Sequence, residues 1–316
     1  MNLKKNKGPL LIAEIGGNHE GNFNYAVKLT KQAIESKVDV IKFQFYTGDT
    51  LVSEIENPKR NSHFKKFELS VDQHIYLAEM IREANIMYSS SVWTTDALSW
   101  IDKYIDIYKI GSGDLTAIPI INEICKLKKP VIVSSGLSSF RDVTQTINLI
   151  KSKKFYKSKN LALLQCTSMY PINFSDVNLK VMMKYKEKFN IPVGYSDHTV
   201  GIKALKYAYS CGAEILEFHF TDNKKNRNFR DHKVSLTKSD ISDLKNEIEI
   251  IDSLMGSDNK TPLKIEIENG HDVSFRRAVY PSKDIKKNEK LDENNLTVLR
   301  PNHGIDARDY YKLIGK

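Results

Sequence analysis

The chain has 316 residues, of which 41% are hydrophobic and 28% are charged. These proportions are typical of soluble globular proteins and exclude disordered and collagen-like chains. The net charge of +9 comes from lysines scattered through stretches such as KSKKFYKSKN (151–160), without the aromatic-interleaved patch of a nucleic-acid-binding surface. We expect no nucleic-acid partner, whereas a phosphorylated or carboxylated substrate is compatible with this charge.

The amino terminus begins with basic residues, but its first apolar run is broken at Glu14. No run approaches the roughly 20 apolar residues of a membrane-spanning helix. The three cysteines, Cys125, Cys166 and Cys211, are widely spaced and lack the CxxC pattern, which favours a reducing compartment and argues against a zinc knuckle. We expect a cytoplasmic protein without a membrane partner.

Short apolar runs alternate along the chain with amphipathic stretches of helical periodicity. Eight strands are predicted, at 10–16, 38–45, 85–92, 105–112, 130–136, 161–171, 191–197 and 214–220. Helical patterns lie at 24–37, 71–84, 140–154, 203–212 and 237–256. This alternation predicts an α/β protein with a parallel (β/α)8 TIM barrel, and a doubly wound open sheet is the alternative.

The pattern stops after Gly256, which we take as the end of a barrel domain at 1–256. Residues 257–273 are polar and are predicted to be a linker. Residues 274–316 contain short β-like pieces that are too small to bury much core alone. We expect a small appended domain that docks on a partner.

Side chains alternate across a strand, so residues two apart share a face. In the last strand alternate positions are apolar and must meet the helices, so Glu217 and His219 point into the barrel. The same parity turns Glu14, Lys42 and Gln44 inward. Barrel active sites lie at the carboxyl ends of the strands. The residues at or near those ends are Glu14, Lys42, Gln44, Lys109, Ser112, Ser168, Tyr170, Ser196, His198, Glu217 and His219.

Each of these residues taken alone is compatible with a surface or structural role, but their types together indicate chemistry. Two lysines among small hydroxyl side chains suit a phosphate, because ammonium charge and compact donors can surround it. Two histidines on adjacent strands, with Glu217 beside one of them, suit an open divalent-metal site. Such a site keeps positions for water and substrate.

Eight segments resemble, in sequence order, the signature segments of the N-acetylneuraminate (sialic acid) synthase family. They are IAEIGGNHEG, VIKFQ, YKIGSGD, VIVSSG, LLQCTSMYP, GYSDHT, EFHFT and KDIKKNEKLDENNLTVLRPNHGI. The resemblance covers nearly the whole chain. It implies an enzyme that joins phosphoenolpyruvate to the aldehyde of an open-chain N-acetylated hexose, N-acetylmannosamine or a deoxygenated diacetamido analogue. The products would be a nine-carbon 2-keto sugar acid and phosphate.

The resemblance further implies a divalent metal, Mn²⁺ or Mg²⁺, and a domain-swapped homodimer. In that dimer a small antifreeze-like (SAF) domain reaches over the partner's active site. The metal ligands would be His198 and His219, and the catalytic residues would be Glu14, Asp114 and Tyr170. The substrate-binding residues would be Lys42, Gln44, Lys109, Ser112, Ser135, Ser168, Ser196, Glu217, Asp231 and Arg300, with Gln44, Asp231 and Arg300 on the sugar.

The chain departs from the family pattern at several positions. Asp114 stands where a glutamate is frequent, and Ser168 replaces a frequent asparagine. SSSVWTT (89–95) replaces the common STPF, and NRNFRDHKVSL (226–236) lacks the usual GPD. Since these changes lie in sugar-contacting regions, the acceptor sugar is not predicted. The chain stops at LIGK, so we expect an abbreviated SAF domain.

Two other functions are consistent with the residues. Lys109 on a barrel strand could form a Schiff base, as in lysine aldolases, and borohydride trapping with pyruvate would reveal that imine. The chain could also be a non-catalytic sugar-binding homologue that has kept the fold.

Overall fold

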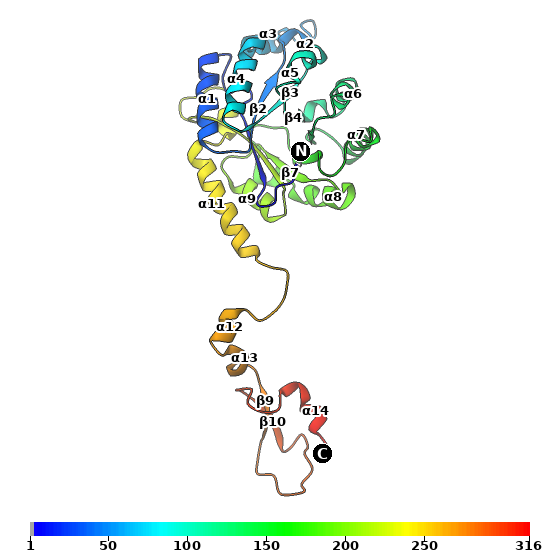
Figure 1. Cartoon of the computed structure of the whole chain (residues 1–316), viewed down its shortest axis with the longest axis vertical. Helices are drawn as coiled ribbons and strands as arrows, with labels where there is room; N and C mark the ends of the chain where they lie inside the picture. Colours follow the sequence, from blue (N-terminus) through cyan, green and yellow to red (C-terminus); the bar gives the residue numbers. More distant parts are fainter. Residues whose placement is uncertain (1–2) are drawn as a thin grey trace. The chain divides into compact units, whose positions relative to one another are not determined.

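Eight parallel strands form a closed barrel in the computed structural model, which describes residues 3–316 (Figure 1). Each strand pairs with the next in sequence, and β8 pairs with β1 to close the barrel. The expected TIM barrel is therefore confirmed and the open sheet is excluded. The strands are β1 (Leu10–Glu14), β2 (Val40–Phe45), β3 (Met87–Val92), β4 (Ile107–Ile110), β5 (Val131–Ser134), β6 (Leu161–Cys166), β7 (Val193–Asp197) and β8 (Ile215–His219).

Helices follow the strands and surround the barrel (Figure 1). They are α1 (Phe23–Glu35), α2 (Gly48–Leu51), α3 (Pro58–Phe67), α4 (Val71–Glu83), α5 (Leu98–Ile101), α6 (Ile118–Lys126), α7 (Phe140–Ser152), α8 (Leu179–Phe189), α9 (Lys203–Ser210), α10 (Asp231–Val234) and α11 (Lys238–Met255). A capping box starts α4 at Ser70 and another starts α7 at Ser139. These two helices begin within a residue of their predicted starts because capping signals are local.

The strands are shorter than the apolar runs predicted. The largest difference is at β6, which ends at Cys166 and not at Pro171. Beyond Cys166 the chain leaves the sheet, and a short 3-10 helix follows at Phe174–Asp176. Among the helices, the polar α3 has little apolar periodicity and was not predicted.

Alternation along the strands divides the apolar residues into two layers. The outer layer packs against the helices and includes Leu216 and Phe218 of β8. The inner layer fills the part of the barrel formed by the first residues of the strands, and it consists of Leu3, Leu10, Ile12, Val40, Ile107, Ile132, Ala162, Leu164 and Ile215. The predicted parity of β1, β2 and β8 is confirmed. The inner layer is an apolar floor beneath the polar carboxyl ends.

Strand register places the inward polar residues at one level. Glu14 of β1 lies opposite Lys42 of β2 and opposite His219 of β8. Ser196 of β7 lies opposite Glu217 of β8. A slip of one residue would turn these side chains toward the helices, so pairing between the strands fixes which side chains meet.

The chain divides into two compact units, Met1–Leu254 and Met255–Lys316. The second unit contains α12 (Lys264–Glu268), α13 (His271–Ser274), β9 (Ala278–Pro281), β10 (Leu296–Leu299) and α14 (Tyr310–Leu313). Strands β9 and β10 pair antiparallel.

The predicted linker at 257–273 is therefore not wholly irregular, because it carries α12 and most of α13. Gly270, with φ of +65°, separates these two helices. Its left-handed backbone conformation is one that glycine adopts at little cost.

In the described part of the chain, no helix has both the length and the apolar character needed to cross a membrane.

His74 is a buried histidine on the core-facing side of α4. Its ring contacts Phe45, with 5.1 Å between ring centroids, and its Nδ1 has no hydrogen-bond partner among the described residues. Burial, with a smaller contribution from His19, lowers the pKa of His74 to about 3. The folded protein therefore holds this imidazole neutral.

We predict that His74 makes the fold sensitive to acid. Below the unperturbed histidine pKa of about 6.5, the unfolded chain binds a proton that the folded chain does not. The free energy of unfolding therefore decreases as the pH is lowered. The loss from this residue should be about 1.4 kcal/mol per pH unit until the folded pKa is reached. Denaturant unfolding of wild type and His74→Leu between about pH 4 and about pH 7 should show a shallower acid slope in the variant. Parallel slopes would contradict the prediction.

Candidate active site

Two buried ion pairs lie at the carboxyl ends of the strands. Lys42 Nζ is 2.5 Å from Glu14 Oε2, and Lys109 Nζ is 3.2 Å from Glu217 Oε1. None of these side chains is more than 7% exposed. Gln44 donates to Glu14 Oε1 at 2.7 Å. The pairs join β1 to β2 and β4 to β8 across the barrel, so four predicted residues do meet.

Hydroxyl groups complete the second pair. Lys109 Nζ donates to Ser134 Oγ at 2.6 Å, and Ser196 Oγ donates to Glu217 Oε1 at 3.0 Å. Ser134 is one of the small hydroxyl side chains that the sequence associates with a phosphate, although only its neighbour Ser135 is predicted to bind substrate. Ser135 Oγ donates to the carbonyl oxygen of Leu164 at 2.9 Å. Alternation from the inward Ile132 could have identified Ser134 as the inward hydroxyl.

The two carboxylates have opposite pKa shifts. Burial, reinforced by the charge of Glu217, raises the pKa of Glu14 against the opposing attraction of Lys42. Burial also acts to raise the pKa of Glu217, but Lys109 and Lys42 outweigh it and lower that pKa. Burial opposes the charged form of Lys42, while attraction to Glu14 and Glu217 raises its pKa. Glu14 is thus the better proton carrier, and Glu217 stays ionised.

His198 and His219 lie beside these pairs, with 5.5 Å between their ring centroids. Both are buried. The His198 Nδ1 lies 2.7 Å from the carbonyl oxygen of Thr167. Because a carbonyl only accepts, Nδ1 must carry the proton, which leaves a lone pair on Nε2. Burial lowers the pKa of both histidines, so both rings are neutral, as metal ligands must be.

The donor chemistry of this pair fits a divalent metal. The His219 Nδ1 is buried without a hydrogen-bond partner among the described residues and lies 3.9 Å from Asp231 Oδ2. Within residues 3–316, no group of three or more histidine, cysteine, aspartate or glutamate side chains is arranged to hold a metal ion. A metal held by the two histidines would therefore need further ligands from water or substrate.

Serine hydroxyls converge near Gly136 in the loop after β5. The Gly136 amide donates to Ser112 Oγ at 3.0 Å. A Cβ at Gly136 would overlap Ser168 Oγ and would lie 2.8 Å from Ser112 Oγ. Ser112 and Ser168 are therefore brought together, and a side chain at position 136 would displace their hydroxyl groups. Asp114 follows Ser112 in the same short helix, and burial raises the pKa of its carboxyl group.

Tyr170 covers the two histidines. Its ring centroid is 3.9 Å from that of His198 and 5.5 Å from that of His219. The guanidinium of Arg230 lies over this ring, 4.7 Å from its centroid, and Arg230 Nε donates to Asp231 Oδ1 at 3.1 Å. Burial raises the pKa of both Tyr170 and Asp231. Tyr170 and Asp231 thus join the histidines, as predicted.

Arg230 and Cys166 are site residues that the sequence did not single out. Arg230 lies in the segment that departs from the GPD pattern, and that departure was the available signal. Cys166 Sγ lies 3.8 Å from His198 Nδ1, and burial raises its pKa to about 11. An apolar core strand gives no sign that its cysteine faces a histidine.

The predicted Arg300 belongs to the second unit. It follows β10, is exposed, and places its guanidinium 5.5 Å from the ring centroid of Phe275.

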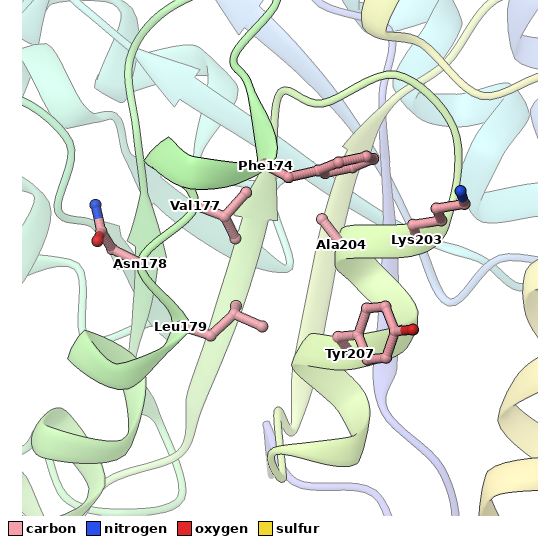
Figure 2. A pocket seen from close by; sticks show the side chains of 7 residues that line it. All are labelled: Phe174, Val177, Asn178, Leu179, Lys203, Ala204 and Tyr207. Atoms are coloured by element: carbon pink, nitrogen blue, oxygen red, sulfur yellow. The ribbon is translucent and has the colours of Figure 1, made fainter.

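An apolar pocket of about 350 Å³ lies outside the barrel, between the loop after β6 and helix α9 (Figure 2). Phe174, Leu179 and Tyr207 line it, and Figure 2 shows the Phe174 ring above the space between the two elements. None of the predicted site residues lines this pocket. The chemistry-bearing residues gather at the carboxyl ends of the strands instead.

The fold and these paired charges define a (β/α)8 barrel with buried ion pairs at the carboxyl ends of its strands. The NeuB family matches residues 29–260, and the SAF domain matches residues 276–316. The chain belongs to the NeuB family.

Relatives cover almost the whole chain. The N,N'-diacetyllegionaminic acid synthase of Campylobacter jejuni is 35% identical over 98% of this chain and 96% of its own. The human N-acetylneuraminate-9-phosphate synthase is 29% identical over 97% of this chain and 87% of its own. A crystal structure of the N-acetylneuraminic acid synthetase of Leptospira borgpetersenii, in complex with citrate, has a TM-score of 0.77 at 29% identity and covers 84% of this chain and 91% of that one. These relatives are synthases, which favours synthesis over the Schiff-base aldolase alternative.

We predict that Lys42 and Glu14 stabilise the fold only as a pair. Lys42→Met leaves a buried carboxylate without its partner and should lower the free energy of unfolding by about 3 to 5 kcal/mol. The double variant Lys42→Met/Glu14→Gln should be more stable than Lys42→Met, because the orphaned charge is gone. Denaturant unfolding of wild type, Lys42→Met, Glu14→Gln and the double variant gives the coupling energy between the two residues. Additive losses would show that the pair has no energetic role.

Proposed function

We propose that this protein condenses phosphoenolpyruvate with an open-chain N-acetylated hexose, giving a nine-carbon 2-keto sugar acid and inorganic phosphate. One observation carries the proposal: two buried lysines, with convergent serine hydroxyls, lie beside two neutral histidines at one end of the barrel. The lysines and serines suit phosphoenolpyruvate, and the histidines suit a metal that binds an aldehyde. The names of the relatives support a nine-carbon sugar acid as product.

Phosphoenolpyruvate would bind through Lys42, Lys109 and the hydroxyl groups of Ser112, Ser168 and Ser196. The lysines provide positive charge where water is excluded, and the hydroxyl groups provide donors of small size. The sugar would contact Gln44 and Asp231 nearer the mouth of the barrel. With phosphoenolpyruvate at the lysines and the sugar nearer the mouth, the aldehyde would lie between them, close to Glu14.

Carbon 3 of phosphoenolpyruvate forms the new bond to the aldehyde carbon, and the aldehyde oxygen takes up a proton. Water adds at carbon 2 and gives up a proton, after which the bond from carbon 2 to the phosphate oxygen breaks. The remaining hydroxyl proton passes to the leaving inorganic phosphate, and carbon 2 becomes the ketone. Glu14, whose pKa burial raises, is suited to move a proton in these steps, while ionised Glu217 holds Lys109 in place.

His198 and His219 would hold a divalent metal, Mn²⁺ or Mg²⁺. When bound, such an ion supplies Lewis-acid polarisation of a carbonyl oxygen. Thr167 fixes the His198 ring through Nδ1, and Asp231 faces His219. The Thr167 contact orients the His198 ring as a metal-bound histidine requires, whereas Asp231, at 3.9 Å from His219 Nδ1, is beyond hydrogen-bond distance.

We also propose a homodimer in which Arg300 of one subunit completes the barrel site of its partner. A small domain gains most by docking, and symmetric dimers can exchange elements. The presence of the SAF domain supports this arrangement. A cytoplasmic location is proposed as well, because Cys125, Cys166 and Cys211 are free thiols.

The central test is phosphate release from phosphoenolpyruvate, assayed across a panel of N-acetylated hexoses with Mn²⁺. Wild type should release phosphate only when a suitable sugar is present. His198→Ala and His219→Ala should each abolish turnover, and EDTA should do so reversibly, with activity returning on addition of metal. Full activity in EDTA would refute the metal role, and no release with any sugar would refute the synthase.

Subunit mixing tests the role of Arg300. His198→Ala and Arg300→Ala subunits should each be inactive alone. After full exchange, half of the dimers are mixed and each has one intact site, so activity should approach about a quarter of wild type by two-fold symmetry. An absence of recovery despite verified exchange would show that Arg300 does not act across subunits.

A further inference from the structure

Arg230 is an exposed cation that is held in a fixed position beside the candidate site. Its side chain is 66% exposed, yet its Nε donates a hydrogen bond to the buried Asp231 and its guanidinium lies over the ring of Tyr170. Two contacts of different kinds therefore fix this group, and a guanidinium so fixed loses little further entropy when it binds a ligand.

The neighbouring residue anchors the same segment. The Phe229 ring packs against Phe67 of α3, with 5.0 Å between ring centroids. A Cβ at Gly17 would lie 3.1 Å from this ring, so Phe229 also covers the chain after β1. The residues that replace the usual GPD pattern are thus built into the barrel, and Arg230 is presented from a supported backbone.

The terminal nitrogens of Arg230 are available to a ligand. A guanidinium has five N–H donors, and Nε uses one of them on Asp231. Neither terminal nitrogen has a hydrogen-bond partner within residues 3–316. Two parallel donors of this geometry match the two oxygens of a carboxylate or phosphate.

We propose that Arg230 determines acceptor specificity by binding an oxyanion, a phosphate or a carboxylate, on the sugar carbon remote from the aldehyde. This inference rests on the proposed function, in which Asp231 contacts the sugar. In that function the aldehyde end would lie near Glu14 and the histidines, and the remote end would extend toward the stack of Arg230 on Tyr170. Lys42 and Lys109 are already paired with carboxylates and committed to the other substrate. The human relative is named for a product that carries a phosphate.

Arg227 provides a matched control from the same loop. Its NH2 group lies 3.2 Å from Asp222 Oδ1, and its guanidinium lies 4.5 Å from the ring centroid of Tyr25. It therefore makes the same two kinds of contact as Arg230, a carboxylate and a tyrosine ring, but with different partners. Neither partner belongs to the candidate site.

The first experiment measures kcat/KM for N-acetylmannosamine, its 6-phosphate and the corresponding 6-carboxylate. Wild type should prefer an anionic acceptor to the neutral sugar, and whichever anion is preferred identifies the group bound. In Arg230→Ala this preference ratio should fall by about tenfold to a hundredfold, the range for losing hydrogen bonds to a charged group. Arg230→Lys should restore part of it, and Arg227→Ala should leave it unchanged. An equal loss for all three acceptors would show that Arg230 only positions Tyr170, and would overturn the proposal.

Equilibrium titration separates this proposal from the proposed function, because binding needs no turnover. The 6-phosphate and the 6-carboxylate are each titrated into wild type, Arg230→Ala and Arg227→Ala without phosphoenolpyruvate. Tighter binding of either anion to wild type than to Arg230→Ala supports the anion site, even if no sugar is turned over and the synthase is thereby refuted. Equal affinities in the three proteins overturn the anion site, even if the synthase is active.

Discussion

The pairing of buried charges at the carboxyl ends of the strands is the constraint on which the site depends. Lys42 with Glu14, and Lys109 with Glu217, place four ionisable groups where water is largely excluded. Unpaired, each would be destabilising by several kcal/mol, about 3 to 5 for the partner of a deleted charge. Paired, they hold two ammonium groups and one carboxyl group of raised pKa in a small volume. The stability of the fold and the protonation of these carboxyl groups thus depend on the same contacts.

That arrangement exists only because strand register places the partners at one level. The closed barrel leaves no edge strand that could slip, and the apolar inner layer beneath the pairs fixes the parity of the strands. The loops then add the rest: Ser112 and Ser168 around Gly136, and Tyr170 over the histidines. The strands thus carry the buried charges, while the loops carry the hydroxyl groups and the tyrosine ring that lie around them.

The barrel could be predicted from the sequence because alternation between strand and helix is a local pattern repeated eight times. The inward direction of Glu14, Lys42, Glu217 and His219 followed from the period of two. Pairing was not predictable, since Lys109 and Glu217 are far apart in sequence and are opposed only by barrel closure. Whether Ser134 or Ser135 points into the barrel depends on where β5 ends, and an apolar run does not mark the end of its strand to the residue. Arg230 was missed because the departure from the GPD pattern marks its segment but does not indicate which residue of that segment lies beside the site.

The apolar floor of the barrel also governs how the lysines interact with salt. Ile12, Val40, Ile132 and their neighbours close the space beneath Lys42 and Lys109, so counter-ions can approach these ammonium groups only from the mouth. Surface lysines such as those of 151–160 are screened over a Debye length of about 8 Å at physiological ionic strength, whereas buried charges are screened much less. The attraction between these two lysines and their carboxylate partners is consequently less sensitive to salt than that of ion pairs on the exterior.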